Sequence, residues 1–200
     1  MNKKIKKLQA KDYITCGIFS AICIVAMLIA AVMNMSGYTT AFYPALASLF
    51  IGILYVVLLA KVPKRGAVLV FGVVPCMYFF LSGVTEGLIG AACLLAFSLI
   101  AEAILWNRHD SVKRITVSGI IYTFYLSLAG SAEHFLFTDT YCSNALAAGI
   151  NEKLVEQMRM MFDKKWLWAV VILCTALLTF FGIMIGRRIM SRHLRKAGIL

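Results

Sequence analysis

The sequence predicts an all-α integral membrane protein, a compact bundle of six transmembrane helices with both termini in the cytoplasm. Hydrophobic residues make up 62% of the 200 residues, whereas soluble domains contain about 45–50%. The apolar residues gather in six stretches, and about 20 such residues cross a hydrocarbon core of roughly 30 Å. The connections between the stretches alternate in charge. We therefore expect a single transmembrane domain over residues 1–200.

The first stretch, residues 13–34, carries no charge between Ile14 and Val32. It follows five lysines, which favour a cytoplasmic start for the helix: Lys3, Lys4, Lys6, Lys7 and Lys11. A cleaved signal peptide is the alternative interpretation. The apolar run exceeds the usual length of about 7–15 residues for a signal peptide, and no A-x-A cleavage site directly follows it.

The other five predicted spans are residues 42–60, 67–82, 85–106, 115–133 and 166–187. The third is short, and the fifth is rich in Tyr, Ser and Gly. On the fifth span, a polar stripe is predicted to face the bundle interior: Tyr122, Tyr125, Ser127 and Ser131. In the sixth, the spacing Gly182-x-x-x-Gly186 predicts close helix packing, within the bundle or with a partner.

Basic residues indicate the orientation. Most of the 20 lysines and arginines lie in the N-terminus, in the connections after the second and fourth spans, and in the C-terminal tail. The positive-inside rule then predicts a multi-pass protein of the cell membrane with both termini cytoplasmic. The net charge of +11 accordingly indicates contact with anionic lipid and no nucleic-acid partner.

The connection between the fifth and sixth spans, residues 132–165, is long, and part of it has a helical pattern. Ile150, Leu154, Val155 and Met158 share one face of that pattern, and Asn151 is a candidate N-cap. We expect a short amphipathic helix lying on the outer membrane surface or over the mouth of the bundle.

Candidate binding residues gather at the predicted outer level. Asn34 and Tyr38 lie in a tight outer loop, and Glu86, Glu133 and His134 lie at the outer boundary. Aromatic residues there, including Tyr43, Tyr78, Trp166 and Trp168, fit either an interfacial aromatic belt or the walls of a small-molecule site. Near the inner boundary, Glu102 is expected to form a structural ion pair with Arg108 or with a basic residue of another inner loop, and proton relay or coupling to a partner is the alternative.

Motifs for catalysis and nucleotide binding are missing. The chain contains no G-x-S-x-G, no H-E-x-x-H and no G-x-x-x-x-G-K-[ST]. The six cysteines form no C-x-x-C pair, and no second histidine accompanies His134 at ligand spacing, so neither a metal site nor a disulfide framework is implied. We expect a protein without catalytic residues or cofactor, which cannot hydrolyse ATP itself.

The opening K-L-Q-A-K-D-Y-I-T-C-G-I-F-S-A, the spacing Ala26-x-x-x-Ala30, the length and the six spans resemble the substrate-binding S components of energy-coupling factor (ECF) transporters. The opening is most similar to the MptD-like branch, also called Trep_Strep. The resemblance implies an outward pocket for a small vitamin-like nutrient. It also implies association with a transmembrane coupling subunit and two cytoplasmic ATPases, with Ala26 and Ala30 at the docking contact.

By position, the resemblance points to the first outer loop and the outer helix ends as the pocket. The substrate-binding candidates are therefore Asn34, Tyr38, Glu86, Tyr125, Glu133 and His134. Two alternatives remain open. One is a permease subunit of another ABC-type transporter, and the other is a membrane-embedded enzyme that uses Glu86, Glu133 and His134.

Overall fold

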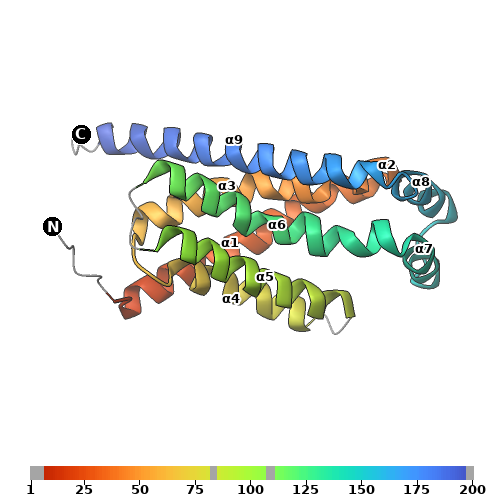
Figure 1. The fold of residues 1–200 in the computed structure, drawn as a ribbon, viewed down its shortest axis with the longest axis horizontal. Helices are drawn as coiled ribbons and strands as arrows, with labels where there is room; N and C mark the ends of the chain where they lie inside the picture. Colours follow the sequence, from red (N-terminus) through yellow and green to blue (C-terminus); the bar gives the residue numbers. More distant parts are fainter. Residues whose placement is uncertain (1–6, 82–84, 107–110, 197–200) are drawn as a thin grey trace.

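The computed structural model describes residues 7–81, 85–106 and 111–196, and within them all regular structure is helical, with no strand. Six long helices run along a common direction and form one bundle (Figure 1). They are α1 (Ala10–Ala30), α3 (Tyr43–Lys61), α4 (Ala67–Leu81), α5 (Thr85–Leu105), α6 (Val112–Leu136) and α9 (Trp166–Lys196).

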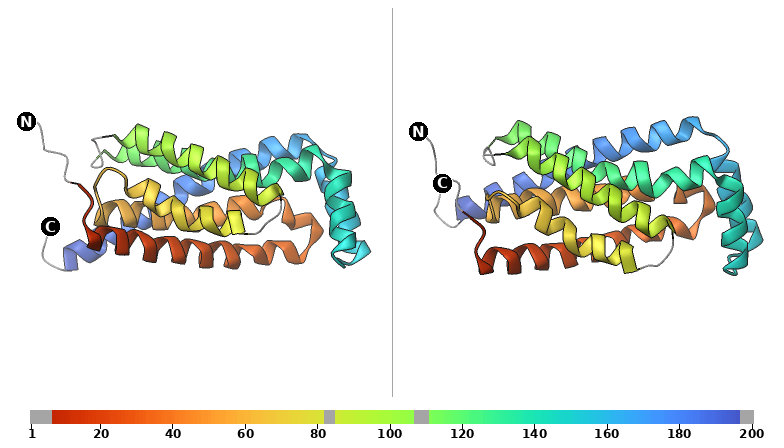
Figure 2. Two further views of the ribbon diagram at one scale, coloured as in Figure 1. Left: turned by 90° about the horizontal axis from the view of Figure 1, so that it is seen from below. Right: turned by 60° about the horizontal axis from the view of Figure 1, so that its bottom comes forward.

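The two ends of the bundle differ. Helix α1 begins and helix α9 ends at the same end, which we call the basal end (Figure 1). Four short helical segments gather at the other end, which we call the capped end (Figures 1 and 2). They are the 3₁₀ helix η1 (Ala31–Met35), α2 (Gly37–Thr40), α7 (Thr138–Ala147) and α8 (Glu152–Phe162).

Five helical stretches of the described chain are long and apolar enough to cross a membrane. They cover Ala10–Met35, Tyr43–Lys61, Gly87–Leu105, Val112–Leu136 and Trp166–Ser191. Helix α4 is apolar but has only 15 residues, or about 22 Å at 1.5 Å per residue, and it contains Pro75. The predicted multi-pass helical bundle is therefore confirmed, while the count of six crossings depends on α4 and stays a prediction.

Helices α3 and α9 pack backbone to backbone, because glycines line their contact. A Cβ atom on Gly182 would overlap the carbonyl oxygen of Leu49, and one on Gly52 would lie 2.7 Å from the carbonyl oxygen of Thr179. A Cβ atom on Gly186 would lie 2.5 Å from a methyl carbon of Val56. The spacing Gly182-x-x-x-Gly186 thus serves packing within the bundle.

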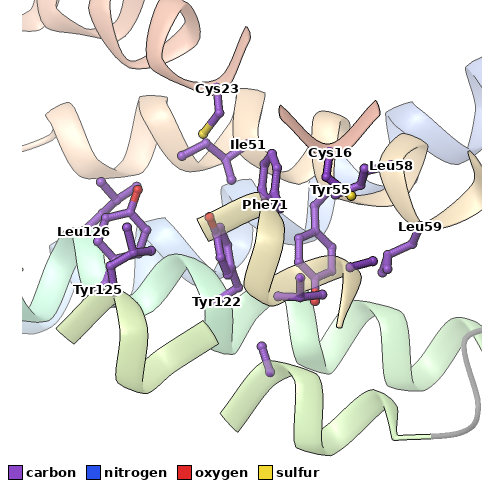
Figure 3. Close-up of a cluster of buried hydrophobic side chains, with 14 of the residues drawn as sticks. Cys16, Cys23, Ile51, Tyr55, Leu58, Leu59, Phe71, Tyr122, Tyr125 and Leu126 are labelled. Carbon is purple, nitrogen blue, oxygen red and sulfur yellow. The ribbon is translucent and has the colours of Figure 1, made fainter. Parts of the chain in front are cut away.

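Aromatic rings fill the middle of the core (Figure 3). The Tyr122 ring lies 5.4 Å, centroid to centroid, from both Tyr55 and Phe71, and 5.9 Å from Tyr125. The predicted polar stripe of α6 does face the interior, since all four of its side chains are buried: Tyr122, Tyr125, Ser127 and Ser131. This prediction is confirmed.

At the basal end, two buried carboxylates secure the connection between α3 and α4. Asp12, near the start of α1, forms a 2.5 Å ion pair with Lys64. Glu102 of α5 accepts hydrogen bonds from the backbone N–H groups of Gly66 at 2.7 Å and Val68 at 3.1 Å, where the first turn of α4 lacks intrahelical acceptors. Glu102 therefore has a structural role at the start of α4, and Arg108, one of the two kinds of ion-pair partner expected for it, lies outside the described residues.

At the capped end, the long connection is ordered into two helices. The amphipathic helix predicted near Asn151 is α8, and the side chain of Asn151 accepts a 2.9 Å hydrogen bond from the N–H of Lys153 as its cap. The apolar face of α8 packs against α2 and α7, so α8 lies over the bundle end. Helix α7, which was not predicted, begins two residues after α6 ends.

Candidate functional site

A cavity of about 360 Å³ lies between the helices near the capped end, within the range of about 300–1,000 Å³ that is usual for small-molecule sites. Its lining comes from η1, α2, α3, α4, α5, α6 and α7. Two lining side chains, Asn34 and Tyr78, are exposed at the surface. The cavity is therefore enclosed by most of the bundle and reaches the surface.

Aromatic side chains provide much of the lining: Tyr43, Tyr78, Phe79, Tyr125 and Tyr141. Phe79 and Tyr125 meet edge to face, with centroids 6.1 Å apart and planes at 79°. The Tyr125 hydroxyl donates to Sδ of Met27 on α1 at 3.8 Å, so this ring spans from α6 to α1. Tyr125 and Leu126 belong to the buried core as well as to the cavity lining, and Tyr125 meets the ring of Tyr122 there (Figure 3).

Polar side chains enter the lining from the capped end: Asn34 from η1, Thr40 from α2 and His134 from the last turn of α6. The imidazole of His134 is stacked on Phe162 of α8 at 5.1 Å and meets the edge of Tyr141 at 4.2 Å. The Thr40 hydroxyl donates to the carbonyl oxygen of Ser36 at 3.0 Å, which leaves its lone pairs available. The ring orientation of His134 is thus fixed by neighbouring side chains.

Small residues form the remaining wall on α5 and α6: Gly87, Gly90, Ala129 and Gly130. A Cβ atom on Gly130 would meet no atom within 4 Å, whereas one on Gly90 would touch the Phe79 ring at 3.6 Å. Because these residues have small side chains or none, the helices themselves bound the cavity here, and larger side chains would occupy part of its volume.

Three of the six predicted binding residues line the cavity, namely Asn34, Tyr125 and His134. Tyr38 of α2 is 47% exposed and is not part of the lining. The side chains of Glu86 and Glu133 lie outside the part of the chain that the structure describes. Their immediate neighbours in sequence, Gly87 and His134, do line the cavity.

Sequence reasoning missed most of the remaining lining, including Thr40, Pro44, Phe79, Gly90 and Tyr141. Tyr141 lies on the unpredicted helix α7, where Tyr141, Cys142 and Ala145 turn inward together. That spacing is a helical signal in the sequence. The sequence does not show whether a glycine of α5 or α6 borders a cavity or packs against another helix, because both roles use the same residue type.

The docking residues implied by the family resemblance also have a defined place. Ala26 is 7% exposed and Ala30 is fully buried, and both face other helices of the same chain. Towards the outer surface of α1, Ala21 is exposed, and Gly17, one helical turn before it, is half-buried. A Cβ atom on Gly17 would meet nothing within 4 Å.

Within the described residues, no group of three His, Cys, Asp or Glu side chains could hold a metal ion. The six cysteines are free thiols, and four of them, Cys16, Cys23, Cys76 and Cys93, belong to or pack against the core. The lining of the cavity offers aromatic rings and the polar side chains of Asn34, Thr40 and His134, which suit ring contacts and hydrogen bonds with a bound molecule.

Comparison with known proteins gives one family. Residues 10–196 match the family described as hypothetical bacterial integral membrane protein (Trep_Strep). The match covers almost the whole chain, and the chain belongs to this family. No curated protein and no solved structure matches it.

Proposed function

We propose that this protein is the substrate-binding subunit of an ECF-type importer, a non-catalytic protein that captures a small nutrient in the cavity at the capped end. The observation that carries the proposal is the cavity itself. It has about 360 Å³ of space, aromatic walls and a few polar groups, which is the usual composition of a small-molecule site. Membership of an integral membrane family supports a role in transport.

The charge distribution gives the proposal its direction. The connection between α3 and α4, with Lys64 and Arg65, lies at the basal end, as does the end of α9, which carries Arg187 and Arg188. The positive-inside rule assigns that end to the cytoplasm. The cavity then faces away from the cytoplasm, where a nutrient arrives.

Uptake requires an energy source outside this chain, because the sequence has no phosphate-binding loop. In keeping with the resemblance of its sequence to ECF S components, we infer that the chain associates with a transmembrane coupling subunit and two cytoplasmic ATPases. These partners supply the conformational work, and the present chain supplies recognition.

We assign the docking contact to the outward face of α1 around Gly17 and Ala21. Close approach of two helices in lipid needs small residues at the surface, and here Ala21 is exposed and Gly17 is half-buried. Docking on Ala26 and Ala30 requires α1 to separate from its neighbours, because both alanines are buried in this conformation. Helix α1 remains the docking element in either arrangement.

Two glycine substitutions test recognition and docking separately. At Gly130 and at Gly17, a Cβ atom meets no atom within 4 Å, so both variants have room to fold. Gly130→Leu fills the cavity and should abolish retention of a small molecule, measured by mass spectrometry of the purified protein, while the complex with the coupling subunit persists in a pull-down. Gly17→Leu should do the reverse.

Two results would overturn these assignments. If Gly130→Leu retains the same molecule as the wild type, the cavity is not the binding site. If Gly17→Leu keeps the complex intact, the docking face lies elsewhere. A wild-type protein that retains no molecule and binds none favours the permease-subunit interpretation.

A further inference from the structure

Two arginines contact the end of helix α5 that lies at the basal end of the bundle (Figure 1). The guanidinium of Arg65, in the connection between α3 and α4, lies over the ring of Trp106, with its central carbon 3.8 Å from the ring centroid. Arg114, in the first turn of α6, donates a 3.4 Å hydrogen bond to the carbonyl oxygen of Ile104. Both guanidinium groups are therefore held in place by neutral groups of α5.

Trp106 has an unusual backbone conformation for a residue of its size. Helix α5 ends at Leu105, and Trp106 follows it with φ +37°, a left-handed conformation in which helix ends usually have glycine. No other non-glycine residue of the described chain has a positive φ. This conformation costs free energy, and it accompanies a 50% exposed indole ring on which Arg65 rests. Trp106 therefore fixes the position of Arg65 at the surface.

The described carboxylates of the basal end are already engaged. Asp12 pairs with Lys64, and Glu102 accepts hydrogen bonds from two backbone N–H groups at the start of α4. Within the described part of the chain, neither Arg65 nor Arg114 forms an ion pair. Two positioned guanidinium groups thus lack a carboxylate partner there.

The nearby negative groups do not balance the positive charge. The C-terminus of α5 and the Glu102 carboxylate together supply about one and a half negative charges, because a helix end is equivalent to roughly half a charge. Arg65, Arg114 and the exposed Lys113 supply one positive charge each. Residues 107–110, which follow, contain one arginine and one aspartate and so add no net charge. The end of α5 therefore has an excess of positive charge that suits an anion.

Apolar surface continues from these arginines along the membrane-spanning helices. Helices α5 and α6 pack against each other, and further along them Leu99, Ile100 and Val117 are each about half exposed. Tryptophan at the end of a spanning helix is typical of the membrane interface. A cationic group next to such a surface matches an anionic amphiphile, since head and chains each find a complementary region.

We propose that the end of α5 binds the phosphate group of an anionic membrane lipid, with Arg65 and Arg114 as its cationic contacts and Trp106 as the positioning residue for Arg65. Arginine suits this role, because its planar guanidinium can donate two parallel hydrogen bonds to phosphate oxygens. The lipid chains lie along the exposed apolar residues of α5 and α6. The site and the cavity are at opposite ends of the bundle, so this inference does not depend on the proposed function.

Lipid competition tests the site. The purified protein is placed in detergent micelles with equal amounts of phosphatidylglycerol and phosphatidylcholine of matched chains, and native mass spectrometry counts the lipids that stay bound. The wild type should prefer phosphatidylglycerol about 25-fold, since each arginine near a membrane surface contributes about fivefold. Arg65→Gln combined with Arg114→Gln should abolish the preference. Arg187→Gln combined with Arg188→Gln, which removes two exposed arginines from the same end, should leave it unchanged.

A third variant, Trp106→Gly, keeps both charges and tests positioning. Glycine suits the φ of +37° at this position, so the variant should fold, and melting temperatures in phosphatidylcholine alone check this for every variant. The preference should fall about fivefold, because Arg65 loses the ring that holds it. Inorganic phosphate at the concentration of the lipid should not displace phosphatidylglycerol, because it makes no contact with the apolar surface.

Each part of the proposal can fail separately from the proposed function. A wild type without preference for phosphatidylglycerol has no lipid site at α5, and the arginines are then available to an acidic protein partner. An equal loss in the Arg187 and Arg188 variant means general attraction to the basic end. Displacement by inorganic phosphate means a site for the free ion. If Trp106→Gly keeps the full preference, Trp106 is not a positioning residue, and this test remains valid even if the Arg65 and Arg114 variant does not fold.

Discussion

Tyr122 is the one buried side chain of the described chain whose polar atom, its hydroxyl, has no hydrogen-bond partner. It is fully buried among the rings of Tyr55, Phe71 and Tyr125. Tyr55, a similarly buried tyrosine, donates to Oγ of Ser118 at 2.5 Å, and that hydroxyl in turn donates to the carbonyl oxygen of Ala101. Of these two buried tyrosines, Tyr55 has a hydrogen-bonded hydroxyl and Tyr122 has a hydroxyl without a partner.

The same substitution should have opposite effects at these two positions. Tyr55→Phe removes a satisfied hydroxyl and should lower the free energy of unfolding by about 0.5–1.5 kcal/mol. Tyr122→Phe removes an unsatisfied one and should leave that free energy unchanged or raise it by about 1 kcal/mol. Thermal unfolding of the purified variants in detergent measures both. Equal destabilisation would mean that the Tyr122 hydroxyl has a partner in the folded protein.

For single residues, the sequence predicted the cavity lining where a polar side chain stands next to an apolar stretch. Asn34 and His134 are polar side chains at helix ends, and both line the cavity. Phe79 and Gly90 line it as well, but phenylalanine and glycine occur throughout membrane helices. Their role depends on which helices lie opposite, and a single sequence does not specify that.

Among the helices, α9 has the closest contact with a neighbour. Its Gly182 lies against the backbone of α3 at Leu49, and the hydroxyl of Ser48 donates to the carbonyl oxygen of Thr175 at 3.0 Å. Thr123 of α6 and Thr179 also share a 2.7 Å hydrogen bond. Helix α9 is thus fixed to α3 and α6 by backbone proximity and hydroxyl groups, the two main sources of helix association in lipid.

A single added carbon tests this contact. Gly182→Ala places a Cβ atom on the Leu49 carbonyl, so α3 and α9 must separate, and we expect a loss of about 1–3 kcal/mol of stability. Gly17→Ala is the matched control, since its Cβ meets no atom, and it should be neutral or slightly stabilising through helix propensity. Melting temperatures in detergent compare the two. Equal melting temperatures would contradict the close packing of α3 and α9.

The predictability of the helices follows from their composition. The sequence predicted the five longest apolar helices from their length and predicted α8 from its amphipathic periodicity. Helix α7, T-D-T-Y-C-S-N-A-L-A, is mostly polar, and it is helical because Tyr141, Cys142 and Ala145 pack against neighbouring segments. The spacing of these three residues is a short signal in a mostly polar segment, and tertiary contact makes the segment a helix.

For the molecule as a whole, the outer surface is apolar along its length. Large hydrophobic side chains are exposed on each of the long helices except α3, among them Ile14 at 64%, Leu28 at 59%, Leu99 at 58% and Leu173 at 59%. A soluble protein rarely exposes apolar patches of this extent. Lipid covers this surface, and the described buried polar groups of the basal end, such as Asp12 and Glu102, lie inside the bundle.

The number of crossings determines the sidedness of the chain, and α4 decides that number. Helix α1 begins at the basal end and α9 ends there, which requires an even number of passages. Five crossings, with α4 alone failing to cross, would leave the two tails on opposite sides and do not fit this arrangement. Six crossings fit it. Four crossings also fit it, if α4, at about 22 Å, and α5 form one re-entrant unit.

We therefore predict that α4 crosses and that both tails are cytoplasmic. In intact spheroplasts, protease should spare epitope tags fused at either terminus, and it should cleave a tag inserted after Gly149, the exposed turn between α7 and α8 with φ +82°. A tag inserted at Arg65, between α3 and α4, should be protected with six crossings and also with four. A tag inserted after Leu81 separates the two, because it should be cleaved if α4 crosses and protected if α4 and α5 re-enter from the cytoplasmic side. A protected tag at Gly149 would turn the cavity towards the cytoplasm and remove the nutrient-capture proposal. Tails on opposite sides would contradict the six crossings.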